Sequence, residues 1–315
     1  MQTDPLRPFK PCWWLKNPHL QTIAATWFKE SGIQGEHRRV ELDDGDFIDL
    51  IWHGHPHPEQ PLVLILHGLE GSESSHYVRS AVRTLSNAGF QVVFMYHRGC
   101  SAEHNRLARS YHSGETGDLA AVLAYIQMHN SSGIYAAIGY SLGANMLLKY
   151  LGEQGKRARL EKAIAISTPF ELGAASIKLN QGVSRIYQHH LVKRLIRRYG
   201  EKFSSRPSPL SVEAARLTTF RAFDHHITAK LNGFASGQDY YTRSSSRQYL
   251  SGISQPCLII HAEDDPFLPA SSIPGALELS EFVEFERCTH GGHVGFLEGG
   301  LLPKRWLEHR ILHFL

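Results

Sequence analysis

Short hydrophobic runs recur along the chain, and segments of mixed polarity separate them. A run that is apolar at almost every position is typical of a parallel strand covered on both faces. Strands are predicted at residues 62–66, 90–95, 135–138, 162–167, 257–261 and 282–286, and helices at 75–88, 118–129 and 144–151. This alternation of strand and helix predicts an α/β fold with a mostly parallel central sheet and right-handed crossovers.

The alternation is interrupted between the fourth and fifth predicted strands. The gap is far longer than one crossover helix requires, and residues 172 to about 231 have a helical pattern. We therefore predict an inserted helical cap over the carboxyl edge of the sheet, where ligands bind in open α/β folds. The predicted boundaries are 1–168 for an N-terminal arm and the first part of the core, 169–250 for the cap, and 251–315 for the second part of the core.

Further expectations concern the two ends of the chain. Residues 1 to about 36 contain prolines and tryptophans with little periodicity, and we expect an extended arm that packs on the body. Segments 37–42 and 46–52 alternate in polarity around a turn and predict a hairpin. A helix is predicted at 270–279, and a final helix is predicted to begin at Pro303.

The predicted cap contains a strongly basic stretch, residues 189–199. Such a stretch most often forms the solvated face of a helix, but it also fits a helix that contacts anionic lipid or a phosphate. The sequence leaves both interpretations open.

Charge and composition narrow the class of protein. The 33 basic and 30 acidic residues nearly balance, and no basic stripe with interleaved aromatic residues occurs, so no nucleic-acid partner is expected. No apolar run approaches the roughly 18–20 residues of a membrane span, so no transmembrane segment is expected. The four cysteines are far apart, which argues against a disulfide framework or a zinc site. Because the N-terminus also lacks the layout of a signal peptide, we expect a cytoplasmic location.

The candidate chemistry centres on Ser141, in the pentapeptide Gly139-Tyr-Ser-Leu-Gly143. This G-x-S-x-G pattern follows an apolar strand and precedes a helix. In that context the serine occupies a sharp turn with its hydroxyl exposed above the sheet, and the glycines allow the backbone to approach its neighbours closely. The pentapeptide alone also fits a purely structural turn, so the assignment of Ser141 as a nucleophile depends on its predicted acid and base partners.

A serine nucleophile needs a base, and the base needs an orienting carboxylate. In folds with this elbow the chain order is Ser, then Asp or Glu, then His. Asp264 and Asp265 follow one predicted strand, and His290 and His293 follow the last one. We favour Asp265, which lies deepest in its turn, and His293, which glycines flank. Asp264 is then a loop or capping residue, and His290 braces its loop.

The negative charge that develops during acyl transfer needs preorganised donors. The backbone N–H of Leu142, directly after the candidate nucleophile, is one expected donor of the oxyanion hole. The other is the N–H of Leu69, in the loop after the strand at 62–66. Chemistry of this kind requires no metal and no organic cofactor, and neither is expected.

Seven motifs in the chain are distinctive together. They are NPHLQT at 17–22, HGLEGS at 67–72, HRGCS at 97–101, YHSGET at 111–116, GYSLGAN at 139–145, DDPF at 264–267 and HGGHVGF at 290–296. With them the chain resembles the α/β-hydrolase superfamily, and within it the bacterial YheT-like candidate esterases, which are related to plant EMB8-like proteins and animal lipase-like hydrolases. The resemblance implies an α/β-hydrolase fold, a Ser-Asp-His triad at Ser141, Asp265 and His293, and carboxylic-ester hydrolase activity. Some eukaryotic relatives act on phospholipids.

The function expected from these observations is a serine esterase that cleaves carboxylic esters through an acyl-enzyme intermediate. Its partner is then a small-molecule or lipid ester. A lipase, phospholipase or thioesterase acting on acyl lipids is the first alternative, and a non-catalytic binding protein on a hydrolase fold is the second. Oligomeric state stays open at this point.

Overall fold

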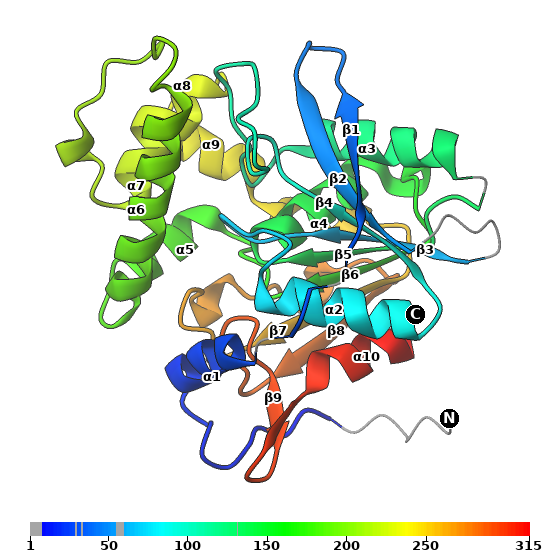
Figure 1. Ribbon diagram of the computed structural model, residues 1–315. Coiled ribbons are helices and arrows are strands. Elements are labelled where there is room, and N and C mark those ends of the chain that lie inside the picture. The colour runs from blue at the N-terminus through cyan, green and yellow to red at the C-terminus, as the bar shows by residue number, and fades with distance from the viewer. Residues whose placement is uncertain (1–7, 29, 33, 55–59, 131) are drawn as a thin grey trace.

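The computed structural model describes residues 8–315 except 29, 33, 55–59 and 131. Its centre is an eight-stranded sheet with the order β1-β2-β4-β3-β5-β6-β7-β8 (Figure 1). The strands are β1 (Glu36–Glu41), β2 (Phe47–His53), β3 (Leu62–Leu66), β4 (Gln91–Met95), β5 (Ala136–Tyr140), β6 (Lys162–Ile166), β7 (Cys257–Ala262) and β8 (Val283–Cys288). Strands β3 to β8 run parallel, whereas β1 and β2 pair antiparallel with their neighbours. The predicted α/β fold and the predicted hairpin are both confirmed.

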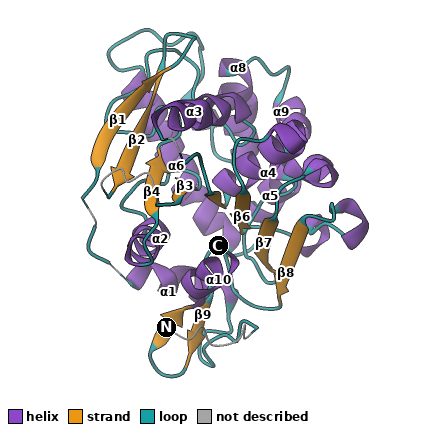
Figure 2. Ribbon diagram, turned by 90° about the vertical axis from the view of Figure 1, so that its right-hand side faces the viewer, coloured by secondary structure: helices purple, strands orange, loops and turns teal. Residues whose placement is uncertain are grey.

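Helices cover both faces of the sheet, which explains why its central strands are so apolar. Every residue of β3, β4, β5 and β7 is buried. Figures 1 and 2 show α2 (His76–Asn87) and α10 (Trp306–Phe314) on one face, and α3 (Thr116–His129) and α4 (Leu142–Gln154) on the other. Because the strands are parallel, the loops after β3, β5, β7 and β8 all emerge at one edge of the sheet.

The chain between β6 and β7 is largely helical, as predicted. Its elements are α5 (Leu172–Leu179), α6 (Ser184–Lys202), η3 (Ala214–Arg216), α7 (Phe220–Phe223), η4 (Asp224–Thr228), α8 (Ala229–Leu231), α9 (Gly237–Ser244) and η5 (Ser246–Gly252). The helices α5 to α9 form a group beside the sheet, at the upper left of Figure 1, which we call the cap. The exact domain boundaries stay a prediction. Within the described part of the chain, no helix combines the length and the hydropathy that crossing a membrane requires.

The helix predicted at 270–279 is wrong. The structure has two separate 3-10 turns there, Ala270–Ser272 and Ala276–Glu278. Pro274 lies between them, where it removes a backbone donor and prevents a continuous helix. The composition of the segment suggested a helix, but Pro274 determines the local structure.

Both ends of the chain also differ from the predictions. The arm is not uniformly extended, because α1 (Pro18–Ala24) begins after Asn17, whose side chain caps two backbone N–H groups. An asparagine followed by proline is a helix-start signal that the sequence argument overlooked. The final helix begins at Trp306, three residues later than predicted, because Pro303–Arg305 pairs as β10 with β9 (Leu297–Gly299). The first part of the predicted arm, residues 1–7, lies outside the described residues.

A buried ion cluster ties the hairpin to α3. The guanidinium of Arg98 donates two hydrogen bonds to Asp118, at 2.9 and 2.6 Å, and one to Asp46, at 2.8 Å. The side-chain amide of Asn105 also donates to Asp46, at 2.6 Å. All four side chains are buried. Carboxylates held away from water depend on such partners for their charge.

We expect Arg98→Met to lower the free energy of unfolding by roughly 3–5 kcal/mol, because it leaves Asp46 and Asp118 buried without their counter-ion. Urea denaturation followed by circular dichroism measures this change. Arg216→Met is the control, since it breaks only an exposed ion pair with Glu213 and should cost less than about 1 kcal/mol. Similar losses in the two variants would contradict the role assigned to the cluster.

Candidate active site

The chain turns sharply from β5 into α4 at Ser141. Its φ of 52° and ψ of −113° lie outside the regions that most residues adopt. The flanking glycines make this turn possible. A Cβ at Gly139 would lie 2.6 Å from the Cα of Ala144, and a Cβ at Gly143 would lie 2.6 Å from the backbone oxygen of Leu66. The turn therefore packs directly against the end of β3.

The loop after β8 carries His293 and is held from two sides. The backbone N–H of His293 donates to the hydroxyl of Thr22 on α1, at 2.9 Å. The N–H of Val294 donates to the hydroxyl of Ser167, just after β6, at 3.0 Å. Gly292, with φ of 59°, has a conformation that favours glycine. Thr22 belongs to the NPHLQT motif, but this role was not predicted from the sequence.

Ser141, His293 and Asp265 form one hydrogen-bonded series. The Nε2 atom of His293 lies 3.0 Å from the Oγ of Ser141, and its Nδ1 atom lies 2.8 Å from the Oδ2 of Asp265. Asp265 is only 2% exposed, and its other oxygen accepts the N–H of Phe267 at 2.8 Å. The ring of Phe267 stacks on the imidazole, with centroids 4.1 Å apart and planes 7° apart. The structure thus brings together the three side chains that the sequence singled out.

The alternative residues form a second pair beside the first. Asp264 lies 3.2 Å from the Nδ1 atom of His290, and its other oxygen accepts the N–H of Gly292 at 3.0 Å. This pair braces the loop that carries His293. The adjacent residues Asp264 and Asp265 therefore contact different histidines. Of these two Asp–His pairs, as the described residues show them, only Asp265–His293 is hydrogen-bonded to Ser141.

The two expected oxyanion donors belong to segments that adjoin Ser141. Leu142 is the first residue of α4, where backbone N–H groups have no partner within the helix. Leu69 follows Gly68, and a Cβ at Gly68 would lie 3.3 Å from the Cβ of Ser141. The loop that carries Leu69 is therefore in close contact with the serine.

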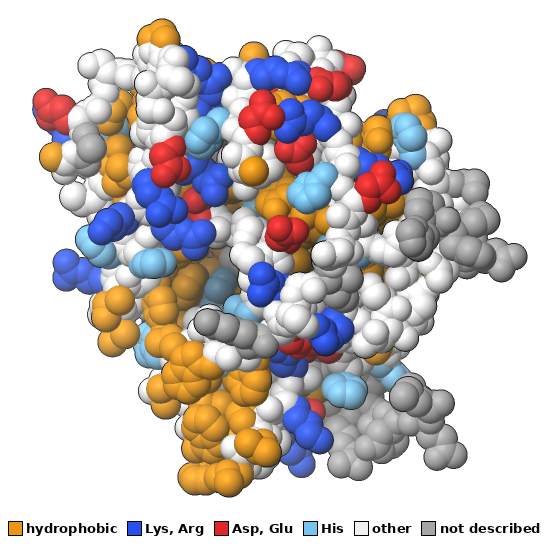
Figure 3. Space-filling model, in the orientation of Figure 1, with side chains coloured by type: hydrophobic (Ala, Val, Ile, Leu, Met, Phe, Trp, Pro, Cys, Tyr) orange, Lys and Arg blue, Asp and Glu red, His pale blue; other side chains and the backbone are white. Residues whose placement is uncertain are grey.

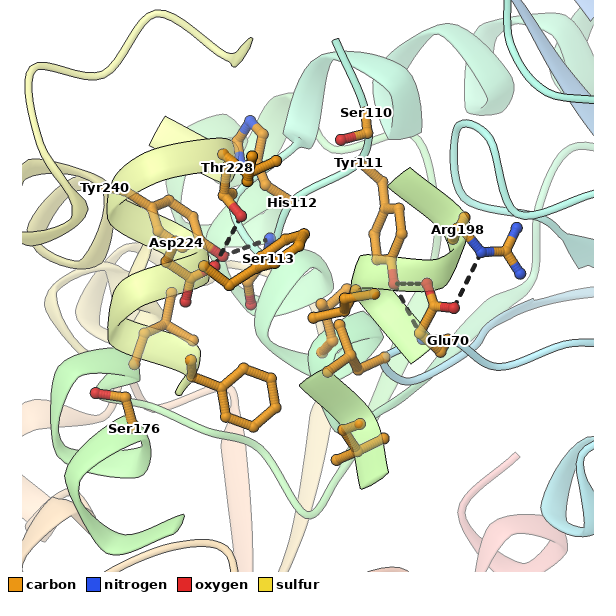
Figure 4. Close-up of a pocket in the computed structure, with 18 of the residues that line it drawn as sticks. Glu70, Ser110, Tyr111, His112, Ser113, Ser176, Arg198, Asp224, Thr228 and Tyr240 are labelled. Atoms are coloured by element: carbon orange, nitrogen blue, oxygen red, sulfur yellow. Dashed lines mark hydrogen bonds and ion pairs between the residues drawn. The ribbon is translucent and has the colours of Figure 1, made fainter. Parts of the chain in front are cut away.

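A cavity of about 160 Å³ lies between Ser141 and the cap. Ser141, His293, Leu69 and Leu142 belong to its wall. The cap contributes mainly apolar side chains, namely Leu172, Ala175, Leu179, Leu191, Leu195, Phe220, Phe223, Ile227 and Leu231. Figure 4 shows polar side chains at two places in this wall, one around Glu70 and one around Asp224. The series Asp265–His293–Ser141 thus opens onto a mostly apolar cavity.

Comparison with known proteins places the chain in a family. The sequence profile of the family described as alpha/beta hydrolase fold matches residues 61–300. The chain belongs to this family. It is 40% identical to YheT, a candidate esterase of Escherichia coli (strain K12), over 318 residues that cover 99% of this chain and 92% of the relative. The predicted resemblance is therefore confirmed.

More distant relatives are named as enzymes that act on lipids. The chain is 27% identical to the monoacylglycerol lipase of Saccharomyces cerevisiae over 265 residues, which cover 81% of this chain and 59% of that protein. It is 26% identical to phospholipase ABHD3 of Mus musculus over 304 residues, covering 92% of this chain and 74% of that protein. Among solved structures, a Pyrococcus furiosus esterase has a TM-score of 0.57 at 16% identity and covers 89% of this chain and 91% of its own, which shows a shared fold.

A network around Glu70 links the Leu69 loop to α6 of the cap. Glu70 has φ of 54° and is buried. Its N–H donates to the hydroxyl of Tyr111 at 3.0 Å, and that hydroxyl donates to the Oε1 of Glu70 at 2.9 Å. Arg198 donates to the Oε2 of Glu70 at 3.0 Å, and Arg194 donates to its carbonyl oxygen at 2.6 Å. This network was not predicted from the sequence, although Glu70 in the HGLEGS loop and the two arginines four residues apart in the predicted cap were visible signals.

The second polar place in the cavity wall is Asp224, at the start of the π-helical turn η4. Its carboxylate accepts the hydroxyl of Thr228 at 2.7 Å and that of Tyr241 at 2.8 Å. Burial raises the pKa of Asp224 to about 6, against the opposing effect of these two hydrogen bonds. An unfolded chain has no such burial, so this carboxyl group takes up protons more readily in the folded state.

We expect Asp224→Asn to make the protein relatively more stable as the pH rises. The pKa of Asp224 is about 6 when folded and about 3.9 in an unfolded chain, so the contribution of this group to wild-type stability decreases between roughly pH 4 and pH 6 as it ionises. Asparagine cannot ionise, and the variant should gain roughly 1–3 kcal/mol on the wild type between pH 4 and pH 7.5. Urea unfolding at the two pH values measures the difference. The exposed Asp43→Asn is the control, and a stability difference independent of pH would contradict the prediction.

Proposed function

We propose that the protein is a serine hydrolase that cleaves carboxylic esters through an acyl-enzyme intermediate. The observation that carries this proposal is the hydrogen-bonded series from buried Asp265 through His293 to Ser141, which ends at the wall of the cavity. A serine hydroxyl becomes a useful nucleophile when a base within hydrogen-bond reach takes its proton. Esterase, lipase and phospholipase relatives in the same family support this function.

In the proposed reaction, the Oγ atom of Ser141 attacks the ester carbonyl while Nε2 of His293 takes the hydroxyl proton. Asp265 accepts the Nδ1–H of His293 and stabilises the imidazolium that forms. The tetrahedral intermediate then collapses, and the alcohol leaves with the proton that His293 holds. The acyl group stays on Ser141 as an ester. Water, deprotonated by His293, attacks this ester, so that the acid is released and the serine is restored.

The N–H groups of Leu142 and Leu69 are proposed to bind the oxyanion of both tetrahedral intermediates. Fixed donors of this kind stabilise charge that develops only in the transition state, and loss of one such donor typically costs 10²–10³-fold in kcat. The hydrogen bonds that fix Glu70, next to Leu69, support a rigid loop at this position. Because Leu142 begins α4, the dipole of that helix adds to the same stabilisation.

The lining of the cavity favours substrates with an apolar acyl group. A lipase, phospholipase or thioesterase acting on acyl lipids is therefore the second candidate, and the apolar side chains of the cap are the observation that supports it. Rates for p-nitrophenyl esters of increasing chain length, a long-chain acyl thioester and a phospholipid separate these activities. A rate that rises with chain length would favour an acyl-lipid substrate, and a rate highest for acetate would favour a small ester.

We expect Ser141→Ala to reduce hydrolysis of p-nitrophenyl butyrate by roughly 10⁴–10⁶-fold, because the nucleophile is removed. A fluorophosphonate probe should label the wild type and fail to label this variant. Ser176→Ala is the matched control, since Ser176 lines the same cavity but donates its hydroxyl to the carbonyl of Gly173, at 2.7 Å. Undiminished hydrolysis by Ser141→Ala would refute the mechanism. A folded wild type without label or activity would favour the binding-protein alternative.

The two histidines of one loop provide a sharper comparison. His293→Gln should lower kcat by about 10⁴-fold, because no base remains for Ser141. His290→Gln should lower it by less than about tenfold, because His290 contacts Asp264 and not the serine. Steady-state kinetics on one ester, with melting temperatures as a check on folding, measure both. Equal losses would mean that the loop, and not a particular base, supports the reaction.

A further inference from the structure

Exposed apolar side chains gather on one side of the molecule. Figure 3 shows them over α1 and the foot of α6, where α6 begins. We call this surface the apolar face and define it by Trp13 in the arm, Leu20 and Ile23 on α1, Ile177 on α5, Val183 and Ile186 at the foot of α6, and Leu301 and Leu302 in the turn between β9 and β10. Several are largely exposed, with 67% for Trp13, 69% for Ile186 and 83% for Leu302. Large apolar patches on a protein surface mark interaction sites.

Contacts between the elements make this surface continuous. The imidazole of His19 on α1 lies 3.2 Å from the hydroxyl of Tyr187 on α6, and the two rings stack. The arm pairs with β9 through the N–H of Cys12, which donates to the carbonyl of Leu297 at 3.1 Å. Segments that are far apart in sequence are therefore fixed side by side.

Basic residues outnumber acidic ones around the apolar face, although Glu298 of β9 lies beside the arm and Arg197 pairs with the exposed Glu201. The sequence contains no aspartate or glutamate between residues 8 and 28, nor between 172 and 200. Exposed basic or titratable side chains in these two segments are Lys10, Lys16, Arg185, His189, His190, Lys193 and Arg197. Figure 3 shows such side chains along α6 above the apolar region.

One face of α6 passes from apolar to basic along its length. Ile186, His190, Lys193 and Arg197 are exposed and spaced four, three and four residues apart, so they lie on the same side of the helix. The opposite side of α6 contributes Leu191 and Leu195 to the wall of the cavity. The same helix therefore borders both the outer face and the cavity.

A series of aromatic ring contacts connects the face with the candidate base. From His19 it continues through Tyr187 to Phe267, with centroids 4.9 Å apart, and from Phe267 to His293, with centroids 4.1 Å apart. The apolar face is therefore next to the serine–histidine site and not on a remote part of the molecule.

We propose that the apolar face is a docking surface for a lipid bilayer that carries anionic headgroups. Apolar side chains and a tryptophan enter the boundary between headgroups and acyl chains, while the surrounding lysine and arginine side chains meet the negative surface. A second copy of the chain fits this face less well. A two-fold dimer would place the same basic rims opposite each other, and like charges at an interface are unfavourable.

The inference goes beyond the proposed function and is tested without catalysis. The full chain with Ser141→Ala is mixed with vesicles of phosphatidylcholine alone or with one third phosphatidylglycerol, and bound protein is measured by flotation. We expect binding to the anionic vesicles, weaker binding to the neutral ones, and loss of the difference at high salt. Absence of binding to anionic vesicles would overturn the proposal, and it would leave the ester hydrolase untouched because the assay contains no turnover.

Variants then locate the surface. Ile186→Glu should weaken binding roughly tenfold, because it removes an apolar side chain and adds repulsion from the headgroups. Lys193→Gln should weaken binding to anionic vesicles about fivefold and leave neutral vesicles unaffected. Met128→Glu, on α3 and 76% exposed, and Lys156→Gln, also exposed, are the matched controls and should change nothing.

Two outcomes would contradict the assignment of this face. Equal losses in Met128→Glu and Ile186→Glu would show that binding does not depend on this surface. Sedimentation without vesicles tests whether a second copy of the chain occupies this face. If the protein forms a dimer and Ile186→Glu dissociates it, the face serves self-association. Unchanged melting temperatures of all variants ensure that the comparison concerns folded protein.

Discussion

The close approach of two backbone segments, the β5–α4 turn and the end of β3, is the constraint on which the candidate site depends. Gly139 and Gly143 leave no room for a Cβ, so the turn packs directly against its neighbours and holds Ser141 in an unusual backbone conformation. A serine on a longer, looser connection would not keep its hydroxyl at a fixed height above the sheet. The parallel sheet positions the other two residues. The loops after β7 and β8 begin at the same edge of the sheet, so short loops are enough to place Asp265 and His293 near Ser141.

The surroundings of this series are as specific as the series itself. Phe267 covers one face of the imidazole, and Thr22 and Ser167 hold the backbone on either side of His293. The neighbouring Asp264–His290 pair stiffens the same loop. In the proposed mechanism, an imidazole held by this many contacts loses little conformational freedom when it acts on the serine, which is the advantage of preorganisation.

Most of the sheet and the identities of the candidate residues could be predicted from the sequence, because both depend on local patterns. Fully apolar runs indicated the buried strands, and a glycine-flanked serine followed by acidic and histidine loops indicated the site. Contacts between distant segments could not be predicted in this way. Thr22 lies 271 residues from His293, and the sequence around Thr22 does not indicate that its hydroxyl accepts the N–H of His293. The errors at Pro274 and at Pro303–Arg305 arose where proline or strand pairing overrode a helix-like composition.

The hydrogen bonds between α6 and Glu70 have a consequence for how a bulky substrate would enter the cavity. Arg194 and Arg198 attach the cap helix to the residue beside Leu69, so a displacement of α6 that widens the cavity also releases the Leu69 loop. A movement of the cap that admits a substrate would therefore also change the position of the Leu69 loop. A movement of α6 away from Glu70 would remove these contacts from the residue next to Leu69, the second proposed oxyanion donor. In the proposed mechanism, Arg194 and Arg198 would thereby couple the position of the cap to the geometry of the oxyanion hole.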